Sequence, residues 1–437
     1  MSGSEQTLST WRNGARCNPC RTKKDTMCAQ WKKGYDPAVP LAWFEKEKRT
    51  NAAGHVEFPG HWFEDYMQLL ISSVEFSSEL PEEIAHGITQ QGVMAAAKAN
   101  KLNSKWLISH ISAREHEYTQ KPAEKFFMAG SISIRSRKRL PQIKVSGHVI
   151  RFGQDVPMKV LEKELQYKTI FMQAITREFP RDYLRCIVST AGKSETEAGW
   201  SALDALDCSR ALWNLSLNSK KMLRMSSGTI SPVNQIVLGS LQTLFKADLD
   251  IIDHKWWHDP NYQEPIRAYD VTENWDKLRK YEKKAMAKMK SSSCEAFIVR
   301  GLLRYVRALD GRDYESIFLK LWSVLEHLTQ TSKENSDVTI RRAVFLWKDN
   351  TFHRQVLYHL KESRNSSVHQ DEFGGRGETL VYQLKRYVEA LLEFLIFEGY
   401  KFPSIEQIKA FLDLPLDRES LVARKRLILK ALRFRSS

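Results

Sequence analysis

Between residues 295 and 400, apolar side chains recur at intervals of three and four, and this spacing constrains the fold more than any other feature of the chain. Five successive segments each place their apolar residues on a single helical face: 298–309, 314–328, 340–347, 352–360 and 380–395. A helix with one apolar face must bury that face against a neighbour. The region therefore predicts an antiparallel helical bundle over residues 294–400.

The residues before the bundle carry a mixed pattern. Residues 61–127 mostly show helical spacing, whereas 131–151 alternate apolar and polar residues, as in a β-hairpin or two short strands. Helical spacing then returns over 157–250. We expect a mainly α protein in four parts: a basic α+β region with a short β-hairpin or small sheet (1–150), a helical middle region that ends in a basic helix (151–293), the bundle (294–400) and a basic C-terminal helix (401–437).

The charge of the chain indicates a polyanionic partner. Its 67 Lys and Arg residues outnumber 52 Asp and Glu residues, for a net charge of +15. Nucleic acid is the first candidate partner and an anionic membrane surface the second. An RNA path is expected along the basic connection of the hairpin and the helix over 274–290, through Arg135, Arg137, Lys138, Arg139, Lys280, Lys283 and Lys284. Trp275 and Tyr281, interleaved with these lysines, resemble a stacking surface for single strands; a merely solvated charged face is the alternative.

The location of the protein follows from what its sequence lacks. The opening residues, MSGSEQTLSTWRNG, have no apolar core, so no secretory signal is expected. The longest apolar run, around 391–397, is too short to span a bilayer. Six scattered cysteines do not form a disulfide framework. We therefore expect a cytoplasmic protein with no membrane partner.

The segment SRNSSVHQDEFGG, residues 363–375, lies between two of the apolar helical patterns. On a continuous helix, Arg364 and His369 would point about 140° apart. Asn365, the two serines and the glycine pair instead favour a helix end or a deformed turn, because Asn and Ser side chains compete for backbone hydrogen bonds. At such an end the arginine and the histidine can converge.

An arginine and a histidine together suit one kind of chemistry. A guanidinium presents a fixed fork of donors that matches a phosphate. An imidazole titrates near neutral pH and can take or give a proton. Beside a ribose 2′-hydroxyl, the base can remove the proton so that the oxygen attacks the adjacent phosphorus, while the guanidinium stabilises the charge that develops. This chemistry cleaves RNA without a metal ion.

The sequence Arg364-Asn365-Ser-Ser-Val-His369 resembles the R-x4-6-H signature of HEPN domains, in which Asn often follows the arginine. The setting is similar too, since the motif precedes a long apolar helix. The segment YESIFLKLWSVLEHLTQT, with Glu326, looks like an early bundle helix of the family. The resemblance covers about residues 296–400 and is nearest to the ApeA-like abortive-infection proteins of bacteria.

This resemblance implies a compact bundle that dimerises, so that two motifs face one cleft, and a metal-independent endoribonuclease with no required cofactor. Arg364 would orient the phosphate, His369 would act as general base or acid, Asn365 would support them and Glu326 would pair with Arg364. The expected role is that of an antiphage or toxin effector, held in check by a sensor or regulatory region before residue 295 that responds to a phage or other trigger. The alternative is a non-catalytic HEPN protein that binds nucleic acid or a partner.

A cysteine pattern near the N-terminus suggests a metal. Cys17, Cys20 and Cys28 have the spacing C-x2-C-x7-C, and His55 is a possible fourth ligand. Zinc prefers four N or S ligands. A structural zinc site and three free thiols are both open interpretations.

Two further segments carry weaker patterns. STAGKSE, residues 189–195, is like half of a phosphate-binding loop, but Ile187 occupies the position of a required glycine, which argues against nucleotide hydrolysis. Residues 417–437 carry seven Lys and Arg against two acids and predict a basic amphipathic helix. That helix could dock on the body through its Leu and Ile face, on RNA, or on a membrane surface.

Overall fold

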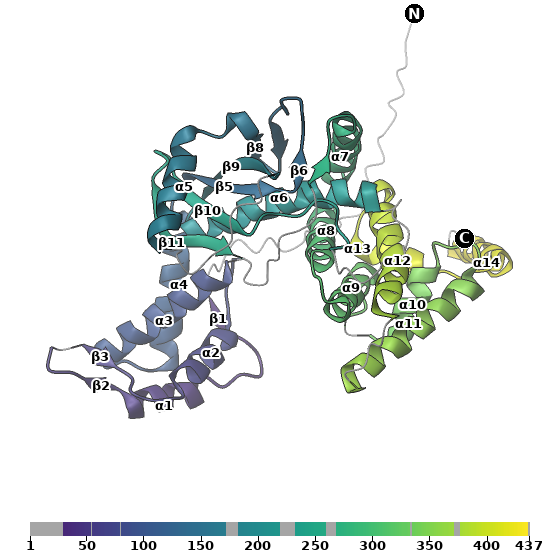
Figure 1. The fold of residues 1–437 in the computed structure, drawn as a ribbon. Coiled ribbons are helices and arrows are strands. Elements are labelled where there is room, and N and C mark those ends of the chain that lie inside the picture. The colour runs from purple at the N-terminus through teal and green to yellow at the C-terminus, as the bar shows by residue number, and fades with distance from the viewer. Residues whose placement is uncertain are drawn as a thin grey trace, which may run out of the picture. The chain divides into compact units, whose positions relative to one another are not determined.

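The computed structural model describes residues 29–435 except 54, 79, 172–181, 219–231, 259–267, 333 and 371–375. The chain divides into two compact units, residues 1–123 and 124–437, and Figure 1 shows the elements of each. Helices make up 60% of the residues that the structure describes, which confirms the prediction of a mainly α chain.

The first unit packs four helices around an aromatic core. They are α1 (Ala38–Glu47), α2 (Phe63–Ser73), α3 (Glu82–Lys98) and α4 (Ser104–Gln120). Two antiparallel strand pairs accompany them, β1 (Gln30–Trp31) with β4 (Val74–Glu75) and β2 (Arg49–Thr50) with β3 (Val56–Glu57). Phe44, Met67 and Leu107 are fully buried. The helices predicted from residue 61 onward are therefore present.

The second unit is built on a six-stranded antiparallel sheet with strand order β11-β10-β5-β9-β8-β7. Its strands are β5 (Glu124–Ile132), β7 (Ile143–Val145), β8 (His148–Phe152), β9 (Leu184–Gly192), β10 (Leu241–Lys246) and β11 (Ile251–His258). Phe126 and Met128 of β5 pack with helix α6 (Glu195–Asn218) on one face. Phe127 and Ala129 pack with helix α5 (Met158–Phe171) on the other. The sheet is therefore covered on both faces (Figure 1).

Helix α6 belongs to both the sheet layer and the bundle. Ala198 and Ala202, near its start, join the core under the sheet, whereas Ala211 and Leu215 join the core of the bundle. Gly192 permits the close approach of α6 to β9, because a Cβ at this position would lie 2.7 Å from the backbone nitrogen of Ala198. The sheet and the bundle thus share one buried helix.

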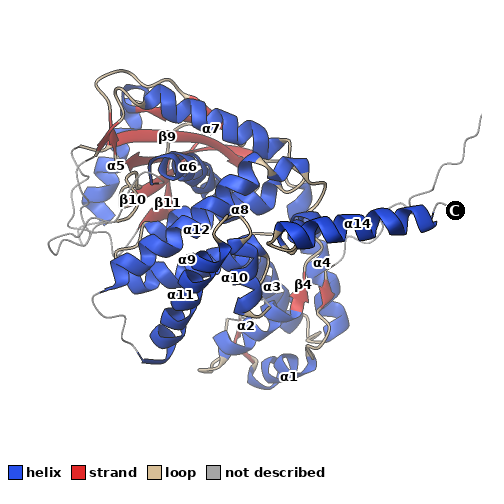
Figure 2. Cartoon of the chain, turned by 90° about the vertical axis from the view of Figure 1, so that its right-hand side faces the viewer, coloured by secondary structure: helices blue, strands red, loops and turns tan. Residues whose placement is uncertain are grey.

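The bundle confirms the five helices predicted between residues 295 and 400. It contains α7 (Trp275–Lys290), α8 (Glu295–Leu309), α9 (Tyr314–Thr329), α10 (Ser336–Val344), α11 (Asn350–Gln370), α12 (Gly377–Phe397) and α13 (Ile405–Leu412). Helix α9 packs against both α8 and α12 (Figure 2). Leu302, Leu325 and Leu392 are fully buried at the centre.

The prediction of a helical middle region over 151–293 is wrong. Strands β9, β10 and β11 lie within it and form the middle and one edge of the sheet. Helices cover both faces of this sheet, so the apolar residues of its strands form continuous runs rather than an alternation. Short apolar runs of this kind cannot be told from helix segments by periodicity. The boundary between compact units also falls after residue 123 rather than near 150.

The predicted hairpin is shorter than expected. Strands β7 and β8 form it, and its two turn residues, Ser146 and Gly147, have φ values of 48° and 86°. Two positive φ values in a two-residue loop match the twist of a hairpin. The basic connection over 135–139 instead follows β6 (Ile134–Arg135), which pairs in parallel with β12 (Tyr269–Asp270).

The predicted C-terminal helix is present as α14 (Arg418–Arg435), but none of its residues is buried. Leu427 is 68% exposed and Ile428 52% exposed, so these two apolar side chains are not buried against the body. Over the part of the chain that the structure describes, no helix combines the length and apolar character needed to cross a membrane.

Candidate functional site

The Arg-x4-His motif lies on α11, which is packed on α10 and α12. Asp349 Oδ1 accepts a hydrogen bond from the Phe352 backbone N–H (3.1 Å) at the start of the helix. Near its other end, Ser363 Oγ donates to the His359 carbonyl oxygen (3.0 Å). The helix runs without interruption to Gln370. The helix break predicted between Arg364 and His369 is therefore wrong.

Arg364 lies on the inner side of α11. It follows the buried Leu357 and Leu360 by seven and four residues, so all three share one helical face, and Arg364 is half-buried. Asn365 is exposed. A continuous helix carries position 369 about 140° around its axis from position 364. The side chain of His369 and the following residues 371–375 lie outside the described residues.

Glu326 on α9 has a partner on its own helix. Its Oε1 accepts a hydrogen bond from Trp322 Nε1 at 2.8 Å, one helical turn earlier. Within the described residues, no ion pair joins Glu326 to Arg364, and the predicted pairing is wrong. The physical reason is local: the Trp322 side chain is buried, so its N–H requires an acceptor, and Glu326 is within reach.

The basic connection before β7 is largely neutralised. Three of its four cations have a carboxylate partner: Arg135 with Asp270, Lys138 with Glu273 and Arg139 with Asp155. Arg137 is exposed, and its backbone N–H donates to Thr272 Oγ1 at 3.1 Å. The connection therefore offers less free positive charge to a polyanion than its sequence suggests.

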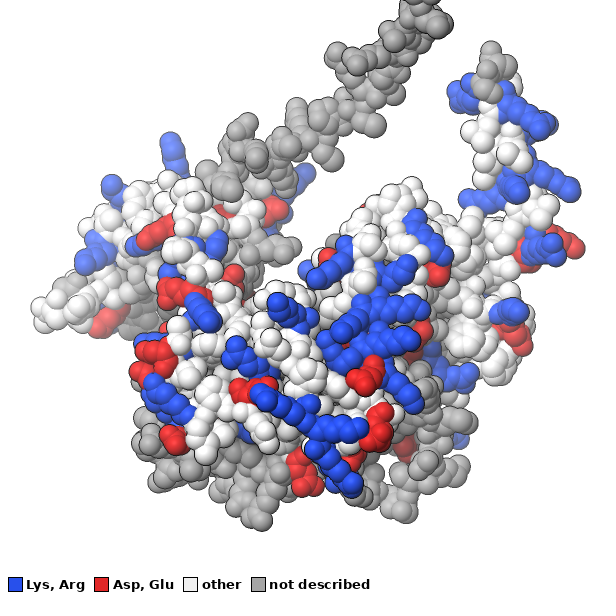
Figure 3. Space-filling model, turned by 90° about the horizontal axis from the view of Figure 1, so that it is seen from above, with Lys and Arg blue, Asp and Glu red and all other residues white. Residues whose placement is uncertain are grey.

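Helix α7 carries the stronger basic surface. Five of its lysines are exposed, and Lys290 is the last residue of the helix. The other four, Lys277, Lys280, Lys283 and Lys284, are called the lysine face below. Lys and Arg side chains gather on the side of the molecule that Figure 3 presents, the side on which α7 lies in Figure 1. Residues 124–437 contain 52 Lys and Arg against 38 Asp and Glu, so this unit holds nearly all the excess charge. Lys277 was not among the residues named from the sequence.

The aromatic residues of α7 do not form the predicted stacking surface. Trp275 is 6% exposed and packs in the core under the sheet. Tyr281 is half-buried, and its hydroxyl donates to Glu393 Oε1 at 3.1 Å. The aromatics beside the lysines come from the end of α12 and from the short 3-10 turn Gly399–Lys401 that follows it. Lys284 Nζ lies 5.2 Å from the Phe397 ring centroid, and Lys288 Nζ lies 3.8 Å from that of Tyr400.

The proposed zinc ligands cannot be placed. Cys17, Cys20 and Cys28 lie outside the described residues, while His55 is exposed. Among residues whose positions are described, no group of three or more His, Cys, Asp or Glu side chains is arranged to hold a metal ion. Cys186, Cys208 and Cys294 are free, buried thiols.

The GKS sequence, residues 192–194, directly precedes α6, and side chains at the start of the helix form hydrogen bonds with the backbone there. Ser194 Oγ accepts a hydrogen bond from the Glu197 N–H (3.1 Å), and Glu197 Oε2 accepts from the Lys193 N–H (2.7 Å). This reciprocal arrangement is a capping box, and it fills the helix N-terminus that a phosphate would need. The geometry agrees with the sequence argument against a nucleotide site.

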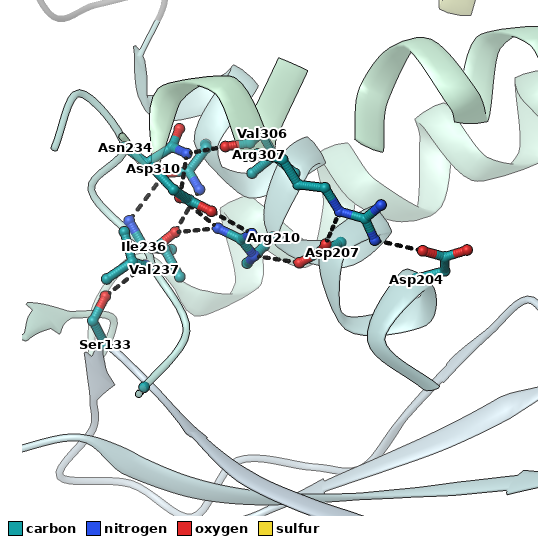
Figure 4. A network of polar contacts seen from close by, with 12 residues as sticks. Ser133, Asp204, Asp207, Arg210, Asn234, Ile236, Val237, Val306, Arg307 and Asp310 are labelled. Atoms are coloured by element: carbon teal, nitrogen blue, oxygen red, sulfur yellow. Dashed lines mark hydrogen bonds and ion pairs between the residues drawn. The ribbon is translucent and has the colours of Figure 1, made fainter. Parts of the chain in front are cut away.

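A buried polar network, not visible in the sequence, joins α6 to α8 (Figure 4). Arg210 Nε donates to Asp207 Oδ1 (2.8 Å), and its terminal nitrogens donate to both oxygens of Asp310 (2.8 and 2.6 Å). Asp207 also accepts from Arg307 (2.7 Å), and Asp310 from Asn234 (2.7 Å). Burial lowers the pKa of Arg210, but Asp207 and Asp310 raise it above its usual range. We call these five residues the Arg210 network, and their role is to hold the sheet layer to the bundle.

A second buried charge pair lies inside the bundle. Lys385 Nζ donates to both oxygens of Glu389 (3.0 and 2.9 Å) and to the Asn218 carbonyl oxygen (2.8 Å), and Tyr305 donates to Glu389 (2.6 Å). Burial raises the pKa of the Glu389 carboxyl, while Lys385 opposes this shift. The hydrogen-bonding groups of these residues are paired with one another, so we assign them a structural role in the bundle rather than a ligand-binding role.

Comparison of the chain with known protein families, with curated proteins and with solved structures found no match.

Proposed function

We propose that this protein is a metal-independent endoribonuclease of the HEPN type, acting as an antiphage or toxin effector. The observation that carries the proposal is the Arg364-Asn365-x3-His369 motif, placed on a bundle helix with Arg364 on its inner face. A bundle preceded by a large second region suits a nuclease that must be restrained. The region before residue 295 is then the sensor or regulatory portion.

The mechanism needs the guanidinium of Arg364 to hold the phosphate and the imidazole of His369 to move the proton of the 2′-hydroxyl. Positions 364 and 369 of one continuous helix lie about 140° apart around its axis, an arrangement that does not favour joint action of one chain's two groups on one phosphate. A homodimer removes this difficulty. We expect each catalytic cleft to combine Arg364 of one protomer with the imidazole of the other.

The lysine face supplies the electrostatic part of the proposal. Four exposed lysines on α7 suit the phosphate backbone of a single strand, independently of its sequence. Glu282, one of the two acids of α7, is buried and accepts hydrogen bonds from Ser209 and Trp213, so it does not offset these lysines at the surface.

The test is cleavage of a labelled single-stranded RNA by the purified full-length protein in excess EDTA. His369→Ala and Arg364→Ala should abolish cleavage, whereas His359→Ala, an exposed histidine on the same helix, should not. An equal mixture of the two inactive variants should regain about a quarter of the parent activity, since half of the random dimers hold one complete cleft out of two. Cleavage that survives His369→Ala would overturn the proposal.

One observation favours a second function, that of a non-catalytic regulator that binds nucleic acid. The helix is continuous through the motif, and the lysine face needs neither Arg364 nor His369 to hold a polyanion. This alternative expects salt-sensitive RNA or DNA binding that is unchanged by Arg364→Ala. It also expects no RNA cleavage and no growth arrest on overexpression.

A further inference from the structure

A cluster of aromatic and basic side chains lies where α10, α11 and α12 meet, about three turns before Arg364. His353 Nδ1 forms a 2.9 Å hydrogen bond with the Tyr387 hydroxyl. The ring of Trp347 lies over that of His353, with centroids 4.2 Å apart. The Arg386 guanidinium carbon lies 6.0 Å from the Trp347 ring centroid. With Phe352, these residues are called the His353 cluster.

The outer side of the cluster is open to solvent. Phe352 is 54% exposed, and its ring lies 5.2 Å from that of His353. Arg386 is exposed, as are Lys348 and Arg354 in the chain next to the cluster. Asp349 is the acid beside them, and its Oδ1 is engaged with the Phe352 backbone N–H. An exposed aromatic ring with cations near it can stack a base while the cations attract the adjoining phosphate.

The imidazole of the cluster is held in one orientation. Burial, and then Arg386, lower the pKa of His353, while Asp349 opposes them. Burial raises the pKa of Tyr387 to about 12, so its hydroxyl is neutral. Tyr387 fixes Nδ1, and within the described residues Nε2 has no hydrogen-bond partner. The side chain therefore presents a neutral ring nitrogen next to a guanidinium.

We propose that the His353 cluster binds one nucleotide of a single-stranded RNA. The base stacks on Phe352, Arg386 holds the phosphate, and His353 Nε2 forms a hydrogen bond with the same nucleotide. The inference rests on the proposed function in taking RNA as the ligand, and it adds a place where the strand is held away from the reacting bond. His353 precedes Arg364 by eleven residues, about 16 Å along α11. One extended strand can span that distance, so the cluster positions the substrate and takes no part in the chemistry.

The experiment measures binding apart from cleavage. Full-length protein carrying His369→Ala, in EDTA, is titrated against a fluorescent single-stranded RNA, and binding is followed by anisotropy. Adding Phe352→Ala or Arg386→Ala to this protein should weaken RNA binding about five-fold or more. Phe352→Tyr, which keeps an aromatic ring at this position, should bind RNA as tightly as the protein with Phe352. Two matched controls should leave RNA binding unchanged. Tyr358→Ala removes an exposed aromatic ring of the same helix, about 120° around the helix axis from Phe352. Arg114→Ala removes an exposed arginine of the first unit. With the parent enzyme, Phe352→Ala should raise KM and leave kcat unchanged.

The outcomes separate the two proposals. If Phe352→Ala and Arg386→Ala bind RNA like the parent, the cluster is not a nucleotide site, even if RNA cleavage depends on Arg364 and His369. If both substitutions weaken binding while Tyr358→Ala does not, the site stands, even if the parent protein cleaves nothing. A loss of binding as large for Tyr358→Ala as for Phe352→Ala would also overturn it, because the effect would then not be specific to the cluster.

Discussion

The two terminal nitrogens of Arg210 on α6 donate hydrogen bonds to the two carboxylate oxygens of Asp310, at 2.8 and 2.6 Å. The two residues are 100 positions apart in the sequence. Asp310 occupies the C-cap position of α8, so this pair ties the helix under the sheet to a helix of the bundle. The Arg210 side chain is 2% exposed, and all three of its nitrogens donate hydrogen bonds. The sheet layer and the bundle, joined in this way, can affect each other's stability.

Replacing Arg210 by alanine should lower the free energy of unfolding of the second unit by about 3 kcal/mol or more, because Asp207 is left buried with one fewer cation. Urea unfolding should show this as a lower midpoint. Arg307→Ala is the matched control in the same network, and since Arg307 is 44% exposed it should cost about 1 kcal/mol or less. Equal losses from both substitutions would contradict the structural role assigned to Arg210.

Glu326→Gln should leave both stability and RNA cleavage nearly unchanged, because a glutamine oxygen can still accept the hydrogen bond from Trp322 Nε1. Glu326→Ala should cost about 1–3 kcal/mol, since the indole N–H loses its acceptor. Thermal unfolding and cleavage rates of both variants check this. If Glu326→Gln loses activity while retaining stability, the carboxylate takes part in the chemistry after all.

Replacing the four residues of the lysine face by glutamine should make RNA binding weaker and less dependent on salt. If all four contact phosphates, the slope of log K against log salt should become shallower by about 3. The control removes four exposed lysines from the first unit, Lys32, Lys33, Lys98 and Lys101, for the same change in net charge. An equal change in slope for both sets would mean that net charge alone, rather than α7, determines binding.

The second unit should lose stability as the pH falls from 7.5 to 5.5. Burial lowers the pKa of His148 below its usual 6.5, and a hydrogen bond joins its Nε2 to Ser201 Oγ at 2.9 Å. The unfolded chain therefore binds a proton near pH 6.5 that the folded chain does not, and the contribution of His148 to stability is lost as the pH falls from that value toward the lower folded pKa. Melting temperatures across this range should fall less steeply for His148→Gln, and an unchanged slope would contradict the assignment.

The helices of the bundle could be predicted because each buries one face. The stripe through Leu380, Leu384 and Leu391, for example, matches α12 closely. The strands could not be predicted in the same way. Ile187 and Val188 of β9 are both buried, on opposite faces of the sheet, so the alternation that marks a strand is absent.

The candidate site was predictable in its residue types but not in its geometry. The sequence supplies Arg364 and His369, yet nothing in it required α11 to continue to Gln370. It also named Arg135 and Arg139 as residues of an RNA path, although Asp270 and Asp155 pair with them. The His353 cluster was missed because its members lie on α11, on α12 and in the loop before α11, and are brought together only by packing.

The sequence by itself determined the positions of the bundle helices and the net charge of +15, because periodicity and charge are properties of neighbouring residues. Only the tertiary structure decided which strands pair, which cations are neutralised and which side chains face the same helical side as Arg364. Those outcomes depend on contacts between residues far apart in the chain, such as Arg210 and Asp310, and the burial that makes such contacts strong exists only once the sheet has packed against the bundle.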